Sequence, residues 1–548
     1  MLRTLAIAIV CLTSTSQCFS TTSTVSMSHN KVKVPSENWQ AIDQLEPQSL
    51  WTQFAILSSI PRPSKQEGAV LDYIKGFADE HGLTWKQDNV GNLVVFHPGS
   101  GGGQQAPPVV VQGHVDMVTE KNSDSSHNFA EDPILLRRFH KNEKEVWLGA
   151  RGTTLGADNG IGVSAALALL ETPVDSNIPL PPLEALFTVD EETGLTGAQQ
   201  LDAKALGLTG TTLLNLDTEE WAELYVGCAG GGESVLTLPL SRKSNADADG
   251  SSANMVQLRV EGLLGGHSGI NIHEGRANAV VLCAAVTQAA LKHEGVDLVS
   301  IKGGDKHNAI PREAFAQLLI SHDKSKQAVM NIVKKYEAAL KAEYGTLEQK
   351  LSVTLVGKDD ANDEDLPCQP LDDAAASRLL SMLLALPHGA IKFSHVMPSL
   401  VETSNNVASV ATNNDCATVL CSTRSSIQSA LEATRDRLTA VACLAGASIE
   451  KSEPYPGWNP DMNSPVLQLA KKLLSERLDG DCAPGVKAIH AGLECGLLIE
   501  KMGGKVDALS FGPTITGAHS PDESIHADTV PPFFQLVRDI LAELAKKR

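Results

Sequence analysis

Residues 108–116 read Pro-Val-Val-Val-Gln-Gly-His-Val-Asp, and this stretch decides the fold. Its short apolar run, rich in β-branched valine, is typical of a strand that is buried on both faces of a sheet. His114 and Asp116 follow where that strand should end. A single His-x-Asp pair usually belongs to a solvated loop, so the meaning of this stretch depends on the rest of the chain.

Four later segments also carry acidic or histidine side chains beside the expected end of an element. They are Gly-Ala-Asp-Asn-Gly at 156–160, Asp-Glu-Glu-Thr-Gly at 190–194, Asn-Leu-Asp at 215–217 and Gly-Ala-His-Ser-Pro at 517–521. Most of them follow an apolar run, and open α/β sheets bind ligands beyond the carboxyl ends of their strands. Five such segments in order indicate one site that is assembled from distant parts of the chain.

Helical and strand patterns alternate between residues 51 and 226, which predicts an α/β fold with a mixed, mostly parallel sheet between helices. The middle of the chain is typical of a separate α+β domain, and residues 506–545 resume the first pattern. We therefore expect a first domain at 37–230 and 451–548, with an inserted domain at 231–450. The expected strands are 93–96, 108–112, 183–189, 212–216, 255–260, 417–422 and 506–511, and the expected helices are 50–57, 67–80, 162–170, 328–342 and 532–545. The glycine- and proline-rich residues 99–107 are interpreted as a dispensable surface insertion.

The composition indicates the number of domains, the kinds of partner and the type of metal ligand to expect. The chain has 548 residues, enough for two or three domains. Its formal charge is −20, without a long cluster of lysine and arginine. This argues against a surface for nucleic acid or for an anionic membrane, because both need basic residues. The ten cysteines are scattered without a Cys-x-x-Cys pair, so any metal should be held by histidine and carboxylate.

The first 36 residues have the composition of a targeting presequence. Arg3 precedes an apolar run at 5–12, serine and threonine follow, and no acidic residue occurs before Glu37. The run is too short to span a membrane. We expect a signal peptide or an organelle presequence, and hence the secretory pathway or an organelle. Initiation at Met27, which would give a cytoplasmic form, is the alternative.

The five segments contain the residue types that hold two metal ions. Catalytic zinc takes nitrogen and oxygen ligands, and paired ions about 3.5–4 Å apart suit a bridging carboxylate. Asp158, in a glycine-flanked loop before an apolar helix, is the natural bridge. His114 and Asp217 would then bind one ion, while Glu192 and His519 would bind the other. We expect two zinc ions, with cobalt or manganese as substitutes.

Two further acids have roles in this arrangement. Glu191, next to a ligand but not itself bound, is placed to act as general base, taking a proton from a water shared by the ions and passing it to a leaving amine. Asp116 is suited to fix the imidazole of His114. Taken singly, the pair at 191–192 could be an acidic turn, and Asp217 could belong to the acid-rich start of a helix. The whole set would require too many coincidences.

With these motifs in place, the sequence resembles the aminoacyl-histidine dipeptidases, also called cytosol non-specific dipeptidases or peptidase D, within a clan of two-zinc peptidases and aminoacylases. The likeness runs from about Leu45 to the C-terminus. It rests on the motifs at 112–118, 155–162, 189–198, 214–220, 265–269 and 517–523. The resemblance implies that His114, Asp158, Glu192, Asp217 and His519 are the zinc ligands, that Glu191 is the general base and that Asp116 orients His114.

The resemblance also assigns a role to the inserted domain, which in that family is a lid over the active site. His267 in Gly-Gly-His-Ser-Gly would reach the scissile carbonyl oxygen and stabilise the developing oxyanion, although His273 competes for this role. Asn308 and Arg424 would hold the backbone and the free carboxylate of the substrate. The stretch from Asp217 to His519 is long for one small lid, so the lid could be enlarged or doubled. His267 could then act on its own chain, whereas a single-unit lid would supply it to a partner in a homodimer.

The function expected from the residues and the resemblance together is zinc-dependent hydrolysis of unblocked L-dipeptides, including those that end in histidine. Another amidase of the same clan, such as an aminoacylase, tripeptidase or carboxypeptidase, is the close alternative, because only contacts from the lid would differ. An inactive binding protein of the same fold is the alternative from another class. It predicts the loss of a ligand or of Glu191, and all are present.

Overall fold

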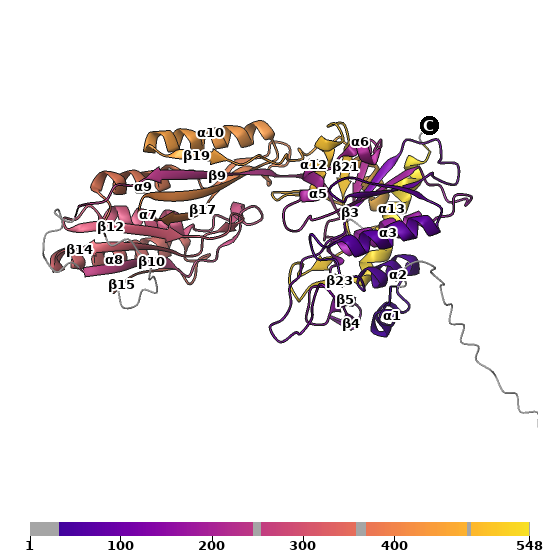
Figure 1. Cartoon of the computed structure of the whole chain (residues 1–548), viewed down its shortest axis with the longest axis horizontal. Coiled ribbons are helices and arrows are strands. Elements are labelled where there is room, and N and C mark those ends of the chain that lie inside the picture. The colour runs from indigo at the N-terminus through magenta and orange to yellow at the C-terminus, as the bar shows by residue number, and fades with distance from the viewer. Residues whose placement is uncertain (1–31, 245–253, 358–368, 479–483, 547–548) are drawn as a thin grey trace, which may run out of the picture.

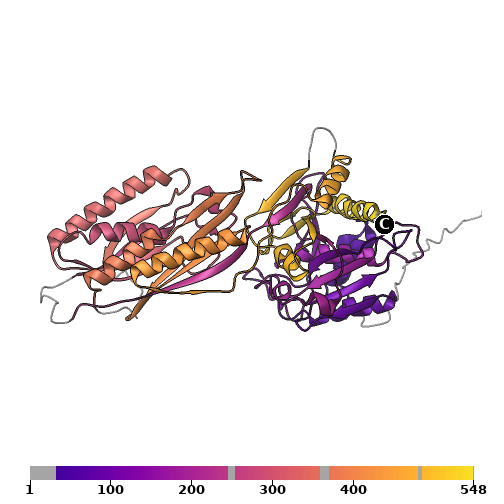
Figure 2. The same ribbon diagram turned by 90° about the horizontal axis from the view of Figure 1, so that it is seen from above.

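The computed structural model describes residues 32–244, 254–357, 369–478 and 484–546. Two bodies lie side by side along the long axis of the molecule (Figures 1 and 2). The first body combines the N-terminal and C-terminal parts of the chain, and the second is formed by the middle part. None of the helices formed by the described residues has both the length and the apolar character that a membrane span needs.

The first body is built on a sheet whose strands, within the described residues, follow the order β1-β2-β6-β3-β7-β21-β8-β20. Four of these pairings are parallel and three are antiparallel. The expected α/β fold with a mixed, mostly parallel sheet is thus confirmed. The strands are β1 (Thr84–Gln87), β2 (Leu93–His97), β3 (Val109–His114), β6 (Leu183–Thr188), β7 (Thr212–Asn215), β8 (Glu223–Cys228), β20 (Gly485–Ile489) and β21 (Asp507–Ser510).

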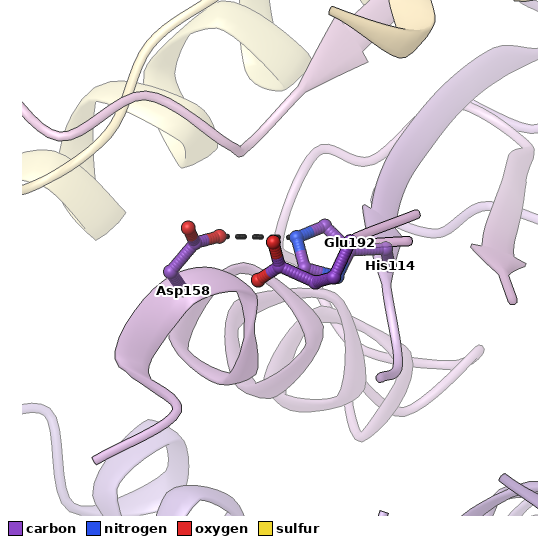
Figure 3. A group of neighbouring side chains, drawn as sticks. All are labelled: His114, Asp158 and Glu192. Atoms are coloured by element: carbon purple, nitrogen blue, oxygen red, sulfur yellow. Dashed lines mark hydrogen bonds and ion pairs between the residues drawn. The ribbon is translucent and has the colours of Figure 1, made fainter. Parts of the chain in front are cut away.

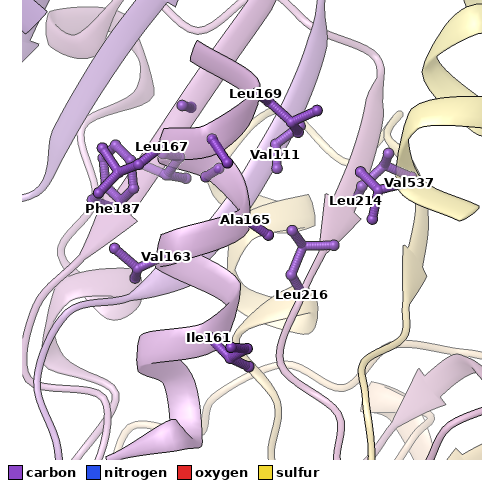
Figure 4. Packing of buried hydrophobic residues seen from close by; sticks show 14 of the residues in the cluster. Val111, Ile161, Val163, Ala165, Leu167, Leu169, Phe187, Leu214, Leu216 and Val537 are labelled. Atoms are coloured by element: carbon purple, nitrogen blue, oxygen red, sulfur yellow. The ribbon is translucent and has the colours of Figure 1, made fainter. Parts of the chain in front are cut away.

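Helices pack around this sheet and around the smaller sheet of the first body. They are α1 (Ser36–Ile42), α2 (Gln48–Leu57), α3 (Gly68–Glu80), α4 (Ala157–Leu170), α5 (Thr196–Gln199), α6 (Ala203–Leu206), α11 (Pro465–Ser475), α12 (Glu494–Lys501), η3 (Ala527–Thr529) and α13 (Val530–Leu544). Helix α4 is apolar on all sides and is buried between β3, β6 and α2, as a helix without a polar face must be (Figure 4). Its packing fixes the loop at its N-terminus relative to the end of β3.

The first body also contains a smaller sheet of order β22-β23-β5-β4. Its strands are β4 (Leu136–His140), β5 (Val146–Ala150), β22 (Ile515–Thr516) and β23 (Ser524–His526). The hairpin β22–β23 carries residues 517–523, and pairing of β23 with β5 attaches this hairpin to an early part of the chain.

Residues 99–107 lie at the surface but are not a loose insertion, and whether they are dispensable stays a prediction. Ser100 is fully buried and exchanges backbone hydrogen bonds with Leu180. A Cβ on Gly103 would lie 2.3 Å from the carbonyl oxygen of Leu180. Three of the glycines, at 99, 101 and 103, lie directly against the backbone of residues 178–182, where a Cβ would not fit.

The second body is an antiparallel sheet of order β15-β10-β14-β12-β17-β18-β9-β19, with β16 paired to β17. The strands are β9 (Gly230–Pro239), β10 (Asn254–Glu261), β12 (Val296–Gly303), β14 (Ala314–Ile320), β15 (Ser352–Gly357), β16 (Gly389–Phe393), β17 (Val401–Thr412), β18 (Cys416–Ser425) and β19 (Ser448–Lys451). The short pair β11 (Gly266–His267) and β13 (Ala309–Ile310) forms a separate two-stranded sheet that contacts β17 and packs against η1 (Ile272–Glu274). Helices α7 (Ala279–Ala290), α8 (Asp323–Tyr344), α9 (Asp373–Ala385) and α10 (Gln428–Ala445) pack in a row with one another and share one hydrophobic core with the sheet.

The second body contains the same topology twice. One unit runs β10-α7-β12-β14-α8-β15 and has the strand order β15-β10-β14-β12. The other runs β9-α9-β17-β18-α10-β19, and its strands follow the matching order in reverse, with the first unit inserted between β9 and α9. The second strands of the two units, β12 and β17, pair and join the halves. The body thus begins at β9 and ends at β19, close to the boundaries at 231 and 450, which stay our proposal.

Of the predicted presequence at 1–36, residues 1–31 lie outside the described residues. Val32 and Val34 pack against the core of the first body, and α1 begins at Ser36.

Candidate metal centre

The five predicted ligands lie together at one edge of the main sheet. His114 ends β3, Glu192 lies in the turn after β6, and Asp217 follows β7. These three strands are parallel neighbours, so their carboxyl ends meet. Asp158 lies at the start of α4, and His519 lies on the β22–β23 hairpin.

The side chains of these residues form two groups around Asp158. His114 Nε2 lies 3.0 Å from Oδ1 of Asp158 and 3.4 Å from Oδ1 of Asp217. His519 Nε2 lies 3.3 Å from Oδ2 of Asp158 and 3.1 Å from Oε2 of Glu192. Two ligands of a tetrahedral zinc ion lie about 3.3–3.5 Å apart, given the usual bond lengths. The two oxygens of Asp158 thus face two different sets of ligand atoms at suitable distances.

The donor atoms fit a metal. His114, Asp158 and Glu192 offer ligand atoms that lie within 4.8 Å of one another (Figure 3). Oε1 of Glu192 and Oδ1 of Asp217 are buried, and neither has a hydrogen-bond partner among the described residues. Buried carboxylate oxygens normally have a partner, so this arrangement favours a bound cation.

The electrostatics of the cluster reflect the crowding of its acids. Burial raises the pKa of Glu191 well above its ordinary value, and nearby Asp217 and Glu192 raise it further. Burial, with Asp158 and Glu192 nearby, also raises the pKa of Asp217 to about 7. Hydrogen bonds that His519 donates to Asp158 and Glu192 raise the pKa of this histidine to about 11. The buried acids thus repel one another, and a bound cation would reduce this repulsion.

Asp116 contacts two segments that carry predicted ligands, namely the end of β3 with His114 and the turn with Glu192. Its carboxylate lies 3.3 Å from Nδ1 of His114 and accepts hydrogen bonds from the backbone N–H groups of Glu191 and Glu192 and from the hydroxyl of Ser64. Burial alone would raise the pKa of Asp116, but the hydrogen bonds from His114 and Ser64 lower it to about 2. A charged Asp116 can hold the imidazole and the 191–192 turn in a fixed relation.

A cleft of about 820 Å³ opens over the ligands, between the two bodies. The first body contributes the five ligands, Glu191 and the segment 486–493, whereas the second contributes residues around Ile270 and Leu400. His273 also lines this cleft. The second body therefore covers the candidate metal centre of its own chain.

The three residues predicted on the inserted domain come together around Ser268, outside the ligand cluster. Nδ1 of His267 accepts hydrogen bonds from the backbone of Gly269 and Ile270, and the backbone oxygen of Asn308 accepts one from the N–H of Ser268. The buried Arg424 lies 3.4 Å from the hydroxyl of Ser268 and donates to Tyr455. Burial and the charge of Arg424 lower the pKa of His267 to about 4, so its imidazole is neutral. None of the three lines the cleft with the ligands.

Sequence reasoning missed several polar residues next to the site. His490, at the end of β20, lines the cleft and lies 2.7 Å from the hydroxyl of Ser404 on the second body. Glu494 is buried beneath the ligands and accepts hydrogen bonds from Gln112 and Thr188. Neither follows an apolar strand run of the kind that marked the five segments. Arg62 and Glu523 were also missed.

The fold and the site define a class, a two-body hydrolase with a metal centre at the edge of an α/β sheet. Comparison with known proteins agrees. A model described as the peptidase dimerisation domain matches residues 258–348, within the first repeated unit of the second body. An aminopeptidase, PepT, from Bacillus cereus is 15% identical, with a TM-score of 0.51 over 92% of this chain and all of that one, which shows the fold alone.

Two nearer relatives decide the family. The cytosol non-specific dipeptidase of Escherichia coli K12 is 39% identical over 506 residues, which cover 92% of this chain and 99% of that protein. The crystal structure of aminoacylhistidine dipeptidase from Vibrio alginolyticus is 38% identical, with a TM-score of 0.80, and covers 92% of this chain and 98% of that one. The chain belongs to the cytosol non-specific dipeptidase family and is a hydrolase of peptide bonds.

Proposed function

We propose that this protein hydrolyses the peptide bond of unblocked L-dipeptides, including those that end in histidine, at a two-zinc centre. The main support for a two-metal centre is the geometry of Asp158, whose two carboxylate oxygens face His114 on one side and His519 on the other. The family membership supports the substrate class, because the relatives that are 39% and 38% identical are named as dipeptidases.

In this proposal, His114, Asp158 and Asp217 hold one zinc ion, and Asp158, Glu192 and His519 hold the other. When bound, such ions polarise a carbonyl group and acidify water. Nitrogen and oxygen donors at tetrahedral spacing favour zinc, and cobalt or manganese would be accepted by the same donors.

Glu191 is the proposed general base. It lines the cleft beside the ligands, and its side chain makes no hydrogen bond or ion pair with any described residue. Burial and the neighbouring acids raise its pKa, as suits a group that takes a proton from water and passes it to the leaving amine. Asp116 is a positioning residue that keeps His114 and the backbone of Glu191 in place.

His267 is proposed to donate to the carbonyl oxygen of the substrate, with Asn308 and Arg424 holding the substrate backbone and its carboxylate. Support comes from their gathering at Ser268, next to cleft residues Gly269 and Ile270. A closing motion of the second body would bring them over the proposed ligands. Because the doubled second body already covers its own cleft, we propose that His267 acts on its own chain.

Assembly and compartment are separate proposals. We propose a homodimer, supported by the match to a peptidase dimerisation domain, and light scattering of the purified full chain would test it. A signal peptide or organelle presequence at the N-terminus stays a prediction, with a cytoplasmic form starting at Met27 as the alternative. Microscopy of the full chain and of a chain starting at Met27, both tagged at the C-terminus, would separate these outcomes.

The activity test compares free Ala-His, N-acetylated Ala-His and a tripeptide as substrates of the zinc-loaded protein. We expect cleavage of the free dipeptide and at least a hundredfold loss in Glu191→Gln, since general bases contribute about 10²–10⁴-fold. Glu184→Gln, a buried carboxylate at the opposite end of β6, is the control. Preference for the blocked or longer substrate would instead favour an aminoacylase, tripeptidase or carboxypeptidase, and no cleavage would favour a binding protein.

A further inference from the structure

Two buried residues of opposite charge lie on either side of Gly156, in the loop that precedes α4. Arg62 is 2% exposed and Glu523 is 3% exposed. Charged side chains are rarely buried to this extent unless their partners are specific, because desolvation is expensive. Their contacts therefore indicate what the two charges do.

Arg62 joins the end of β3 to the loop that precedes α4. Its Nη1 donates to the backbone oxygens of Val115 and Asp116, both at 2.9 Å, and its Nη2 donates to the oxygen of Gly156 at 2.5 Å. The planar guanidinium suits this task because its donors have a fixed geometry. His114 and Asp158 each lie within two residues of these contacts.

Glu523 joins the same loop to the hairpin that carries His519. One carboxylate oxygen accepts from the backbone N–H groups of Leu155 and Gly156, at 2.7 and 2.9 Å. The other accepts from the N–H groups of Ala157 and Asp158, at 2.8 and 3.3 Å. Four donors converge on one carboxylate, and the last belongs to the proposed bridging residue.

The glycines of the 156–160 segment make room for this arrangement. A Cβ on Gly156 would lie 2.5 Å from Nη2 of Arg62, and one on Gly160 would lie 2.7 Å from the same atom. Gly156 also has a φ of +69°, which glycine adopts most readily. The spacing of the two glycines around Asp158 is thus explained by contact with Arg62.

We propose that Arg62 and Glu523 are positioning residues that hold the segments of His114, Asp158 and His519 in the relative places that two metal ions require. Arg62 binds the backbone oxygen of Gly156, and Glu523 binds its N–H group. Together they fix this loop so that Asp158 presents one carboxylate oxygen to each histidine. This inference rests on the two-metal site proposed above. Residues beyond the ligands typically change metal affinity or activity by about 10–100-fold when they are substituted.

The test is a titration of the metal-free full-length protein with Co²⁺, followed by visible absorption, for wild type, Glu523→Gln and Arg62→Lys. Glu523→Gln keeps the size of the side chain, but its single amide oxygen cannot accept from four backbone donors. Arg62→Lys keeps the positive charge but loses the planar, two-pronged set of guanidinium donors. Matched controls are Glu184→Gln and Arg435→Lys. Glu184 accepts from the backbone of Thr209 and Gly210 far from the site, and Arg435 is equally buried and binds carbonyl oxygens of Glu233 and Ser452.

We expect both test variants to bind Co²⁺ at least tenfold more weakly and to show an altered cobalt spectrum, while each control stays within threefold of wild type. Test variants that bind Co²⁺ like their controls would overturn the proposal, even if they are less stable. If Glu523→Gln does not fold, the comparison of Arg62→Lys with Arg435→Lys decides by the same criterion. A wild-type protein that fails to take up two Co²⁺ ions would instead overturn the proposed function.

Discussion

Gly156→Ala should destabilise the first body more than an alanine at a glycine of the same backbone geometry. A left-handed φ costs an L-residue about 1–2 kcal/mol, and Gly156 has a φ of +69°. The new Cβ would also lie 2.5 Å from Arg62 Nη2 and 2.9 Å from the sulfur of Met117, neither of which can move freely. Overpacking of this kind adds about 1–3 kcal/mol, so the free energy of unfolding should fall by about 2–5 kcal/mol.

The matched control is Gly82→Ala. Gly82 has a φ of +66°, but no atom lies within 4 Å of its would-be Cβ, so only the backbone term of about 1–2 kcal/mol applies. All six tryptophans lie in the segments 32–230 and 451–546, so tryptophan fluorescence during urea unfolding reports on the first body. Equal losses in the two variants would contradict the tight contact between Gly156 and Arg62.

Three further outcomes are expected. Removal of metal with a chelator should lower the melting temperature measured by calorimetry, because without metal the buried carboxylates of the site repel one another. Addition of zinc should restore the melting temperature. A melting temperature that the chelator leaves unchanged would count against the metal centre. His267→Ala should lower kcat on Ala-His with little change in KM. Arg424→Lys should raise KM by at least about tenfold, since a hydrogen bond to a charged group is worth about 1.5–3 kcal/mol. The reverse pattern in steady-state kinetics would exchange the two roles. Gly103→Ala should lower the free energy of unfolding in urea by about 1–3 kcal/mol, because its Cβ would meet the oxygen of Leu180. Activity per folded molecule should be retained. Full stability would contradict the close packing of Gly103 against Leu180.

The sequence was sufficient to predict the main sheet and that the five proposed ligand residues lie close together. Each ligand except His519 lies beside a strongly apolar element, and the carboxyl ends of parallel strands such as β3 and β6 must meet. That rule fixes which side chains come together even when the strand order is unknown. His519 was found from its motif, and its position depends on pairing of β23 with β5, a contact between segments far apart in the chain.

The residues that support the ligands could not be predicted in this way. Arg62 and Glu523 act through backbone groups of a loop that is distant in sequence, and no periodicity marks such contacts. The same limit applies to the contacts of residues 99–107, since glycine is required both in free loops and where two backbones touch. The roles proposed for His267, Asn308 and Arg424 come only from the family resemblance, because their spacing in the sequence does not predict that they approach the cleft.

The most direct test of the metal centre is a crystal structure of the zinc-loaded protein with anomalous scattering measured at the zinc edge. Two peaks about 3.5–4 Å apart are expected, one beside His114 and Asp217 and the other beside Glu192 and His519, with Asp158 between them. A single peak, or two peaks that do not share Asp158, would contradict the two-metal site from which the proposed dipeptidase chemistry follows.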